Sequence, residues 1–161
     1  HVYRHFMEQT PKRDNIKYSI LTNGLMFREF YNTVPQVINN LQELGVSIDG
    51  ASKETYEKLR LGGRWEKILE GLECMTELKK KYNFRFSLHM VVQQENWHEV
   101  ESMLELGRTY NVDRIYFNKI EDWNTGIDFE SQTFTELEEF KKSIRRVSTD
   151  PIVWNNAVTL T

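Results

Sequence analysis

Short segments in which apolar and polar residues alternate recur along the chain, and longer segments with apolar residues at helical spacing lie between them. The alternating segments predict strands at 18–22, 46–49, 84–92 and 114–118, and the residues after Pro151 are a candidate for another strand. Helical spacing predicts helices over 34–44, 65–81 and 133–147, and one that follows residue 96. Strands and helices in this alternation are typical of parallel βαβ units, so we expect an α/β fold with an open sheet or part of a barrel.

Local signals place the ends of these helices. Pro35 suits a first helical turn, and Gly45 would end the helix predicted there. Asn96 and Glu99 have the spacing of a capping box for the helix that is predicted to follow residue 96. The glycine pair at 62–63 lacks the glycine spacing and the lysine of a phosphate-binding loop, so we interpret it as a hinge between two helical pieces.

Parallel strands are usually apolar on both faces, but three of the predicted strands carry polar residues at every second position. The polar set comprises Ser47, Asp49, Arg85, Ser87, His89, Tyr116 and Asn118. A sheet face open to solvent would produce this pattern, and so would a polar cavity inside a barrel. We favour the cavity, because the polar set recurs on three strands and a parallel sheet rarely leaves one face in water.

Composition narrows the class of protein and of partner. With 161 residues, 39% of them hydrophobic, the chain suits one domain spanning residues 1–161. The net charge is −3 and the basic residues are dispersed, so we expect no nucleic acid and no membrane partner, but a small-molecule or peptide substrate. The single cysteine, Cys74, excludes an intrachain disulfide and any multi-cysteine metal site within these residues, and a cytoplasmic location fits best.

The most distinctive residues lie where the predicted strands end, which is where parallel α/β folds bind ligands. The segments are Leu-Thr-Asn-Gly at 21–24, Val-Ser-Ile-Asp-Gly at 46–50, and Thr-Tyr-Glu-Lys-Leu-Arg at 55–60 followed by Gly-Gly at 62–63. In this order and spacing they resemble the middle of a radical S-adenosylmethionine (SAM) domain, from about residue 20 to residue 118. The branch they resemble most includes molybdenum-cofactor biosynthesis, anaerobic sulfatase maturation and peptide-modifying enzymes.

The resemblance implies a partial parallel (β/α) barrel, to which this chain contributes about the third to sixth strands of a TIM-like barrel. Family members hold a 4Fe–4S cluster with a three-cysteine motif and cleave SAM reductively to a 5′-deoxyadenosyl radical, which abstracts hydrogen from a substrate. Neither that motif nor the family's Gly-Gly-Glu segment occurs in these residues. We therefore expect SAM and the cluster in an intact parent enzyme, and an inactive chain without tightly bound cofactor when these residues stand alone.

The resemblance also implies which residues meet SAM. Ser47 would lie near its ribose and carboxylate, and Asn23 and Asp49 would line the same pocket. An equally good interpretation of Ser47 and Asp49 is a strand-to-turn junction in which Asp49 caps backbone groups of residues 50–52.

Four more residues follow from the same resemblance. Arg85 and Ser87 are the candidates to meet the SAM carboxylate. Arg85 would lie low in the barrel, where a solvated strand start is the favoured interpretation, so Ser87 is the better candidate. His89 and Asn118 would face the reacting carbon of a substrate. No catalytic residue and no metal ligand is assigned.

Two other functional classes stay open. One is a non-catalytic α/β binding or scaffold module derived from such a barrel, and the other is a metal-dependent hydrolase that uses Asp49, His89 and Asp122. If neighbouring strands are missing, the strand that ends at Thr22 would have an open edge. We then expect self-association through that edge or by exchange of residues 152–160.

Overall fold

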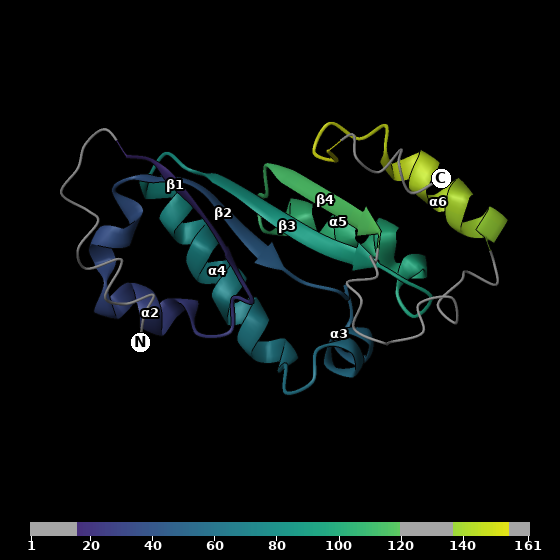
Figure 1. Ribbon diagram of the computed structural model, residues 1–161, viewed down its shortest axis with the longest axis horizontal. Coiled ribbons are helices and arrows are strands. Elements are labelled where there is room, and N and C mark those ends of the chain that lie inside the picture. Colours follow the sequence, from purple (N-terminus) through teal and green to yellow (C-terminus); the bar gives the residue numbers. More distant parts are fainter. Residues whose placement is uncertain (1–15, 120–136, 155–161) are drawn as a thin grey trace.

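The computed structural model describes residues 16–119 and 137–154. Its sheet has four strands in the order β1-β2-β3-β4, and all three pairings are parallel. The strands are β1 (Tyr18–Thr22), β2 (Leu41–Ser47), β3 (Arg85–Val92) and β4 (Arg114–Lys119). The helices are α2 (Phe27–Thr33), α3 (Lys53–Leu59), α4 (Trp65–Lys81), α5 (Val100–Thr109) and α6 (Leu137–Val147), with two 3-10 helices, η1 (Pro35–Ile38) and η2 (Trp97–Glu99) (Figure 1). The expected α/β class is confirmed.

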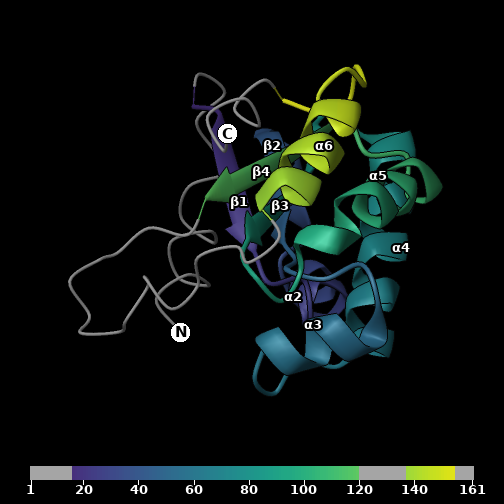
Figure 2. The same ribbon diagram turned by 90° about the vertical axis from the view of Figure 1, so that its right-hand side faces the viewer.

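The helices gather on one face of the sheet, as Figure 2 shows from the side. Apolar residues at alternate strand positions point to that face and are fully buried; they are Leu44, Val46, Ile48, Phe86, Leu88, Met90, Val92, Ile115 and Phe117. The helices bury Ile68, Leu72, Met75, Val100 and Met103 in the same core. Burial of these two apolar surfaces against each other is the main force that holds the layers together.

The opposite face, which we call the inner face, carries the polar set predicted from the alternation. Strand register brings its residues into rows that cross the sheet. The rows pair Ser19 with Glu43 and Arg85; Leu21 with Gly45, Ser87 and Arg114; and Ser47 with His89 and Tyr116. His89 and Tyr116 are half-buried, and Ser87 is fully buried.

The helix predicted over 34–44 is wrong. Residues 35–38 form the short helix η1, and β2 begins at Leu41, five residues before the predicted strand start at 46. Apolar spacing misled the prediction, because the register of β1 against β2 shifts between Tyr18 and Ser19. This irregularity places both Leu41 and Leu44 in the core, three positions apart, and so imitates the spacing of a helix.

The capping box does not form. Asn96 is the N-cap of η2 but makes no side-chain cap hydrogen bond, because its Oδ1 accepts from the N–H of Gln93, and α5 begins only at Val100. The hinge between two helical pieces is confirmed: α3 ends at Leu59, α4 begins at Trp65, and Gly62 between them has a φ of 79°. After Pro151 the structure has one isolated parallel bridge, Ile115 to Val153. Asp122, the start of the helix predicted from 133, and residues 155–160 lie outside the described residues.

Candidate functional site

The loops that follow β2 and β3 are joined through Asp49, two positions after the end of β2. Its Oδ1 accepts a hydrogen bond from the backbone N–H of Val91 at 2.9 Å, and its backbone carbonyl accepts one from Asn96 Nδ2 at 2.9 Å. Asn96 is fully buried and also donates to the carbonyl of Val91 at 2.8 Å. Asp49 therefore braces β3 rather than the turn at residues 50–52, and the strand ends are held in a fixed relation.

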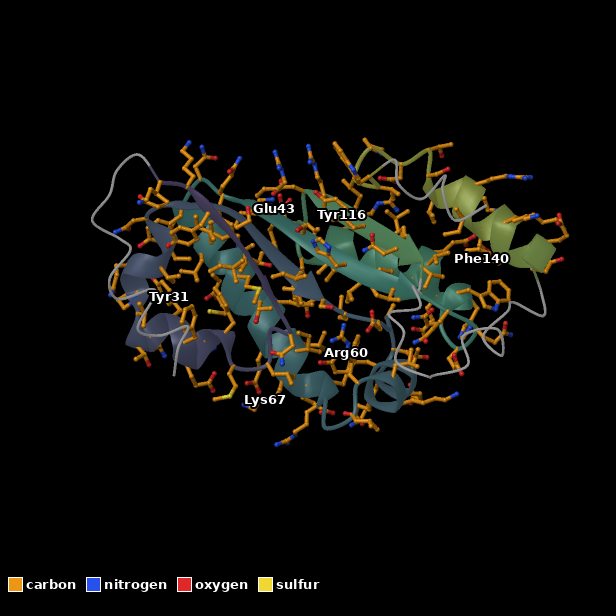
Figure 3. All side chains as sticks on the ribbon, viewed as in Figure 1. Tyr31, Glu43, Arg60, Lys67, Tyr116 and Phe140 are labelled. Atoms are coloured by element: carbon orange, nitrogen blue, oxygen red, sulfur yellow. The ribbon has the colours of Figure 1, made fainter. Side chains whose placement is uncertain are left out.

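Arg60 reaches back from the end of α3 to the same strand end. Its Nη2 donates to Ser47 Oγ, and its Nε lies 2.7 Å from Asp49 Oδ2. The Nε atom is buried and has no hydrogen-bond partner, so its contact with Asp49 is an ion pair without the alignment of a hydrogen bond. Figure 3 shows Arg60 between the end of the sheet and the helices that follow β2.

A cavity of about 330 Å³ opens beside Arg60. Its lining combines polar Asn23 and Arg60 with apolar side chains, and the full set is Asn23, Leu25, Tyr56, Leu59, Arg60, Leu61 and Gly63. Asn23 is exposed, and its Oδ1 accepts a hydrogen bond from the N–H of Leu25 at 3.3 Å. The structure thus brings the predicted residues Asn23, Ser47 and Asp49 to one end of the sheet, with Arg60 joining them.

Glu99 fixes the turn that follows Asp49. It is 8% exposed and accepts hydrogen bonds from Ala51 N–H at 2.6 Å, Ser52 Oγ at 2.5 Å and Thr55 Oγ1 at 2.8 Å. Burial raises the pKa of its carboxyl, but the bonds from Ser52, Ala51 and Thr55 outweigh it, so the pKa is lowered. This carboxylate holds the start of α3, which carries Arg60 at its far end.

Arg85 and Ser87 belong to a second group, on the inner face. Arg85 Nη1 lies 3.2 Å from Glu43 Oε2, and Ser87 Oγ donates to Glu43 Oε1 at 2.8 Å. Tyr116 donates to the same Oε1 at 3.4 Å, and Figure 3 shows Glu43 and Tyr116 lying close together, apart from Arg60. The two candidates for the SAM carboxylate are therefore engaged with Glu43, and they lie seven and five positions before the end of β3 at Val92.

His89 stacks on Tyr116 with ring centroids 4.4 Å apart, and its Nε2 lies 3.2 Å from Ser87 Oγ. Burial lowers the pKa of His89, against an opposing effect of the Glu43 carboxylate. Asn118 is half-buried beside Val91 in the β4 register. Both residues predicted to face a substrate come from neighbouring strands on the inner face.

Cys74 is 6% exposed in α4, and burial raises the pKa of its thiol. A buried thiol in the helix layer does not fit a 4Fe–4S cluster, which needs several cysteine thiolates. Among residues 16–119 and 137–154, no group of three or more His, Cys, Asp or Glu side chains could hold a metal ion. No helix in this part of the chain is long and apolar enough to cross a membrane.

Comparison with known proteins decides the family. A family model described as the radical SAM superfamily matches residues 2–107. The chain belongs to the radical SAM superfamily. A relative of this radical SAM chain, the AdoMet-dependent heme synthase of Methanosarcina barkeri (strain Fusaro / DSM 804), is 30% identical over 95 residues, which are 55% of this chain and 24% of the relative. The probable GTP 3′,8-cyclase of Saccharolobus islandicus is 25% identical over 136 residues, 80% of this chain and 42% of the relative.

Solved structures of radical SAM-like fold agree with the expected partial barrel. Streptococcus suis SuiB bound to S-adenosylmethionine aligns with a TM-score of 0.61 at 11% identity, over 91% of this chain and 31% of SuiB. TYW1 with a lysine-pyruvate adduct bound aligns with a TM-score of 0.57 at 17% identity, over 85% of this chain and 42% of TYW1. The chain thus spans less than half the length of each curated relative and solved structure named here, and the likeness shows a part of the TIM-like barrel.

Sequence reasoning missed Glu43 and Arg60, although both contact residues that it named. Arg60 stands in the quoted segment at 55–60, so a signal was available: an arginine just before a glycine hinge after a strand-end Asp-Gly turn. Glu43 carried no such signal, because it fell within a segment assigned to a helix.

Proposed function

We propose that this chain is the part of a radical SAM enzyme that holds the polar end of SAM and one wall of the substrate site. The observation that carries the proposal is the group Asn23, Ser47, Asp49 and Arg60 beside the 330 Å³ cavity at the carboxyl end of the sheet. Superfamily membership supports SAM as the ligand for this group.

The residues fit SAM chemically. The guanidinium of Arg60 has five N–H donors, of which the one on Nε faces Asp49 and one on Nη2 bonds to Ser47, and a planar guanidinium can bind a carboxylate or ribose hydroxyls with the others. Ser47 and Asn23 add a hydroxyl and an amide, while Leu25 and Tyr56 give apolar surface beside them. Asp49 holds the guanidinium in place through their ion pair, so its role is to orient Arg60.

When bound in the intact enzyme, SAM supplies the adenosyl group whose reductive release gives the radical of the family. The cluster that drives this release cannot be held by Cys74, so its ligands belong to another segment of the parent protein. Arg60, Ser47 and Asn23 bind and orient SAM, and the inner face, with His89 and Asn118, shapes the space beside it. We propose that the parent abstracts hydrogen from a small-molecule or peptide substrate in the cytoplasm.

A peptide substrate is supported by one comparison. Streptococcus suis SuiB bound to the precursor peptide SuiA has the same fold as this chain, with a TM-score of 0.60 at 12% identity, over 83% of this chain and 29% of SuiB. The inner face offers both hydrogen-bonding groups and exposed apolar Leu21 and Trp154. Such a mixture suits the backbone and side chains of an extended peptide.

The test is SAM binding by the intact, anaerobically reconstituted parent protein with Arg60→Met and Ser47→Ala. Losing a hydrogen bond to a charged group costs about 1.5–3 kcal/mol, so Arg60→Met should raise the Kd for SAM roughly ten- to a hundredfold. Ser47→Ala should raise it by a smaller factor. Isothermal titration calorimetry measures both, and 5′-deoxyadenosine formation gives a second readout.

Lys58→Met is the matched control, because Lys58 is an exposed cation in the last turn of α3, two positions before Arg60. It should leave the Kd unchanged. Thermal unfolding without SAM separates a folding defect of Arg60→Met from a binding defect. An unchanged Kd for SAM in both Arg60→Met and Ser47→Ala would contradict the proposal.

A further inference from the structure

A chain of hydrogen bonds on the inner face runs from Glu43 through Ser87 to His89. These residues belong neither to the lining of the proposed SAM pocket nor to the apolar core. Ser87 Oγ lies 2.8 Å from Glu43 Oε1 and 3.2 Å from His89 Nε2. Ser87 is fully buried, so the three groups have a fixed spacing. A buried network of this kind constrains where each proton sits.

The direction of these bonds follows from the donor inventory. Glu43 pairs with Arg85 and is a carboxylate, so it can only accept. Ser87 has one proton, which goes to Glu43, and its oxygen must then accept from His89 Nε2. His89 is thereby held with its proton on Nε2, and its Nδ1 carries a free lone pair.

The ring is fixed in position as well as in tautomer. One ring face stacks on Tyr116 at 4.4 Å between centroids, with 17° between the planes. Gly45 lies under the Nε2 edge, where a β-carbon would come within 2.8 Å of Nε2 and 3.1 Å of Cδ2. The edge that carries Nδ1 is therefore turned away from β2.

Within the described residues, Nδ1 makes no hydrogen bond, and it is not one of the buried atoms without a partner. Nδ1 therefore keeps some accessible surface in the part of the chain that the structure describes. Glu43 from β2 and Tyr116 from β4 lie closest to the ring. Three cations lie one residue further out: Arg85 on Glu43, Arg60 on Ser47, which is the register partner of His89, and Arg114, the register partner of Ser87. Burial keeps the pKa of His89 below its usual range, which preserves the lone pair at neutral pH.

We propose that His89 is a positioning residue whose Nδ1 accepts a hydrogen bond from a neutral hydroxyl or amide N–H group of the substrate. The inference rests on the proposed function in one respect, since it takes the inner face as the place where a substrate lies. Nδ1 offers only a lone pair, so a deprotonated anion, which has no proton to donate, cannot bind it. The ligand class is thus a hydrogen-bond donor, such as a peptide amide or an alcohol.

The first test is nitrogen-15 NMR of the histidine rings in the 161-residue chain, with His89→Gln to assign the signal and His98→Gln as control for an exposed histidine. We expect the Nε2–H tautomer for His89 at pH 7.5 and a mixture of tautomers in Ser87→Ala, while His98 is unaffected. An Nδ1–H tautomer or an imidazolium at that pH would overturn the proposal. The result does not depend on SAM, so it is independent of the test of the SAM pocket.

The second test uses acetamide as a donor probe and acetate as an acceptor-only probe. Acetamide should move the Nδ1 resonance of His89 to lower frequency, and acetate should leave it in place. An equal response to acetate, or no response to either probe at saturation, counts against a donor-specific site. Modification by diethyl pyrocarbonate, with exposed His98 as the positive control, checks access: an unlabelled His89 beside a labelled His98 would contradict an open Nδ1.

Discussion

Glu99 shows how one residue can organise a site that it does not line. Its carboxylate takes three hydrogen bonds from residues 51–55, although it lies more than forty positions later in the chain. Those residues start α3, and α3 ends next to Arg60. Because the carboxylate is almost buried, each donor would lose a partner that water could not easily replace.

We predict that Glu99→Ala lowers the free energy of unfolding at pH 7 by about 2–4 kcal/mol, since it leaves buried donors unsatisfied. The folded-state pKa of Glu99 is lowered, so its stabilisation is complete above the unfolded-state value of about 4.3 and is lost as pH falls through the folded pKa. Urea denaturation at pH 7 and at lower pH measures both effects.

Glu101→Ala is the control for this variant, because Glu101 is exposed on α5 and its ion pair with Arg146 is at the surface. It should change the free energy by less than about 0.5 kcal/mol. If Glu99→Ala were as mild as Glu101→Ala, the role of Glu99 in holding residues 51–55 would be contradicted.

The residues of the site were predictable to different degrees. Asn23, Ser47 and Asp49 follow from the rule that polar residues at the carboxyl ends of parallel strands form sites. Their partners do not follow, because the contact of Asp49 with Val91 depends on strand register and that of Arg60 on the angle between α3 and the sheet. The contacts of Glu43 could not be predicted, because it lies in β2 and the apolar spacing of that segment predicted a helix.

At the scale of elements, the long helix α4 was predicted well and β2 was not. The seventeen residues of α4 give several turns of regular apolar spacing, and the basic residues in its last turn interact favourably with the negative end of the helix dipole. The segment 34–44 contains fewer turns, and a single register shift at Tyr18 changed its apparent period. The structure of a short segment is determined by how it pairs with neighbouring strands, and the local sequence pattern carries no information about that pairing.

The packing of α4 on the sheet depends on one close approach. Gly71 lies against the turn that follows β1, where a β-carbon would come within 2.4 Å of the Gly24 carbonyl oxygen. Backbone atoms cannot swing aside as a flexible side chain can. The turn also carries Asn23, so the seating of α4 fixes one wall of the 330 Å³ cavity.

We predict that Gly71→Ala destabilises the protein, although alanine favours an isolated helix over glycine by about 0.5–1 kcal/mol. The clash should cost more than this gain, with a net loss of about 1–3 kcal/mol in the free energy of unfolding. Glu73→Ala, an exposed position on the same helix, is the control and should be nearly neutral. Chemical denaturation measures both, and a stabilised Gly71→Ala would contradict the close approach.

On the scale of the whole molecule, the sheet has one face covered by helices and one polar face, which is how a barrel wall is built. Within the described residues β1 pairs with β2 alone, so one side of β1 has no strand beside it there. Ser19 and Leu21 are exposed on this strand, and Leu21 keeps 59% of its surface accessible. A strand edge with an exposed apolar side chain tends to pair with another chain.

We predict that the 161-residue chain self-associates through β1, since pairing would satisfy backbone groups on its outer side and cover Leu21. Light scattering coupled to size-exclusion chromatography should show a mass that rises with concentration toward that of a dimer. Leu21→Lys places a charge on the edge and should shift the equilibrium to the monomer. Met26→Lys, at a side chain 69% exposed but outside the strand, should not. A wild-type chain that stays monomeric at every concentration, or equal effects of the two lysines, would contradict pairing through this edge.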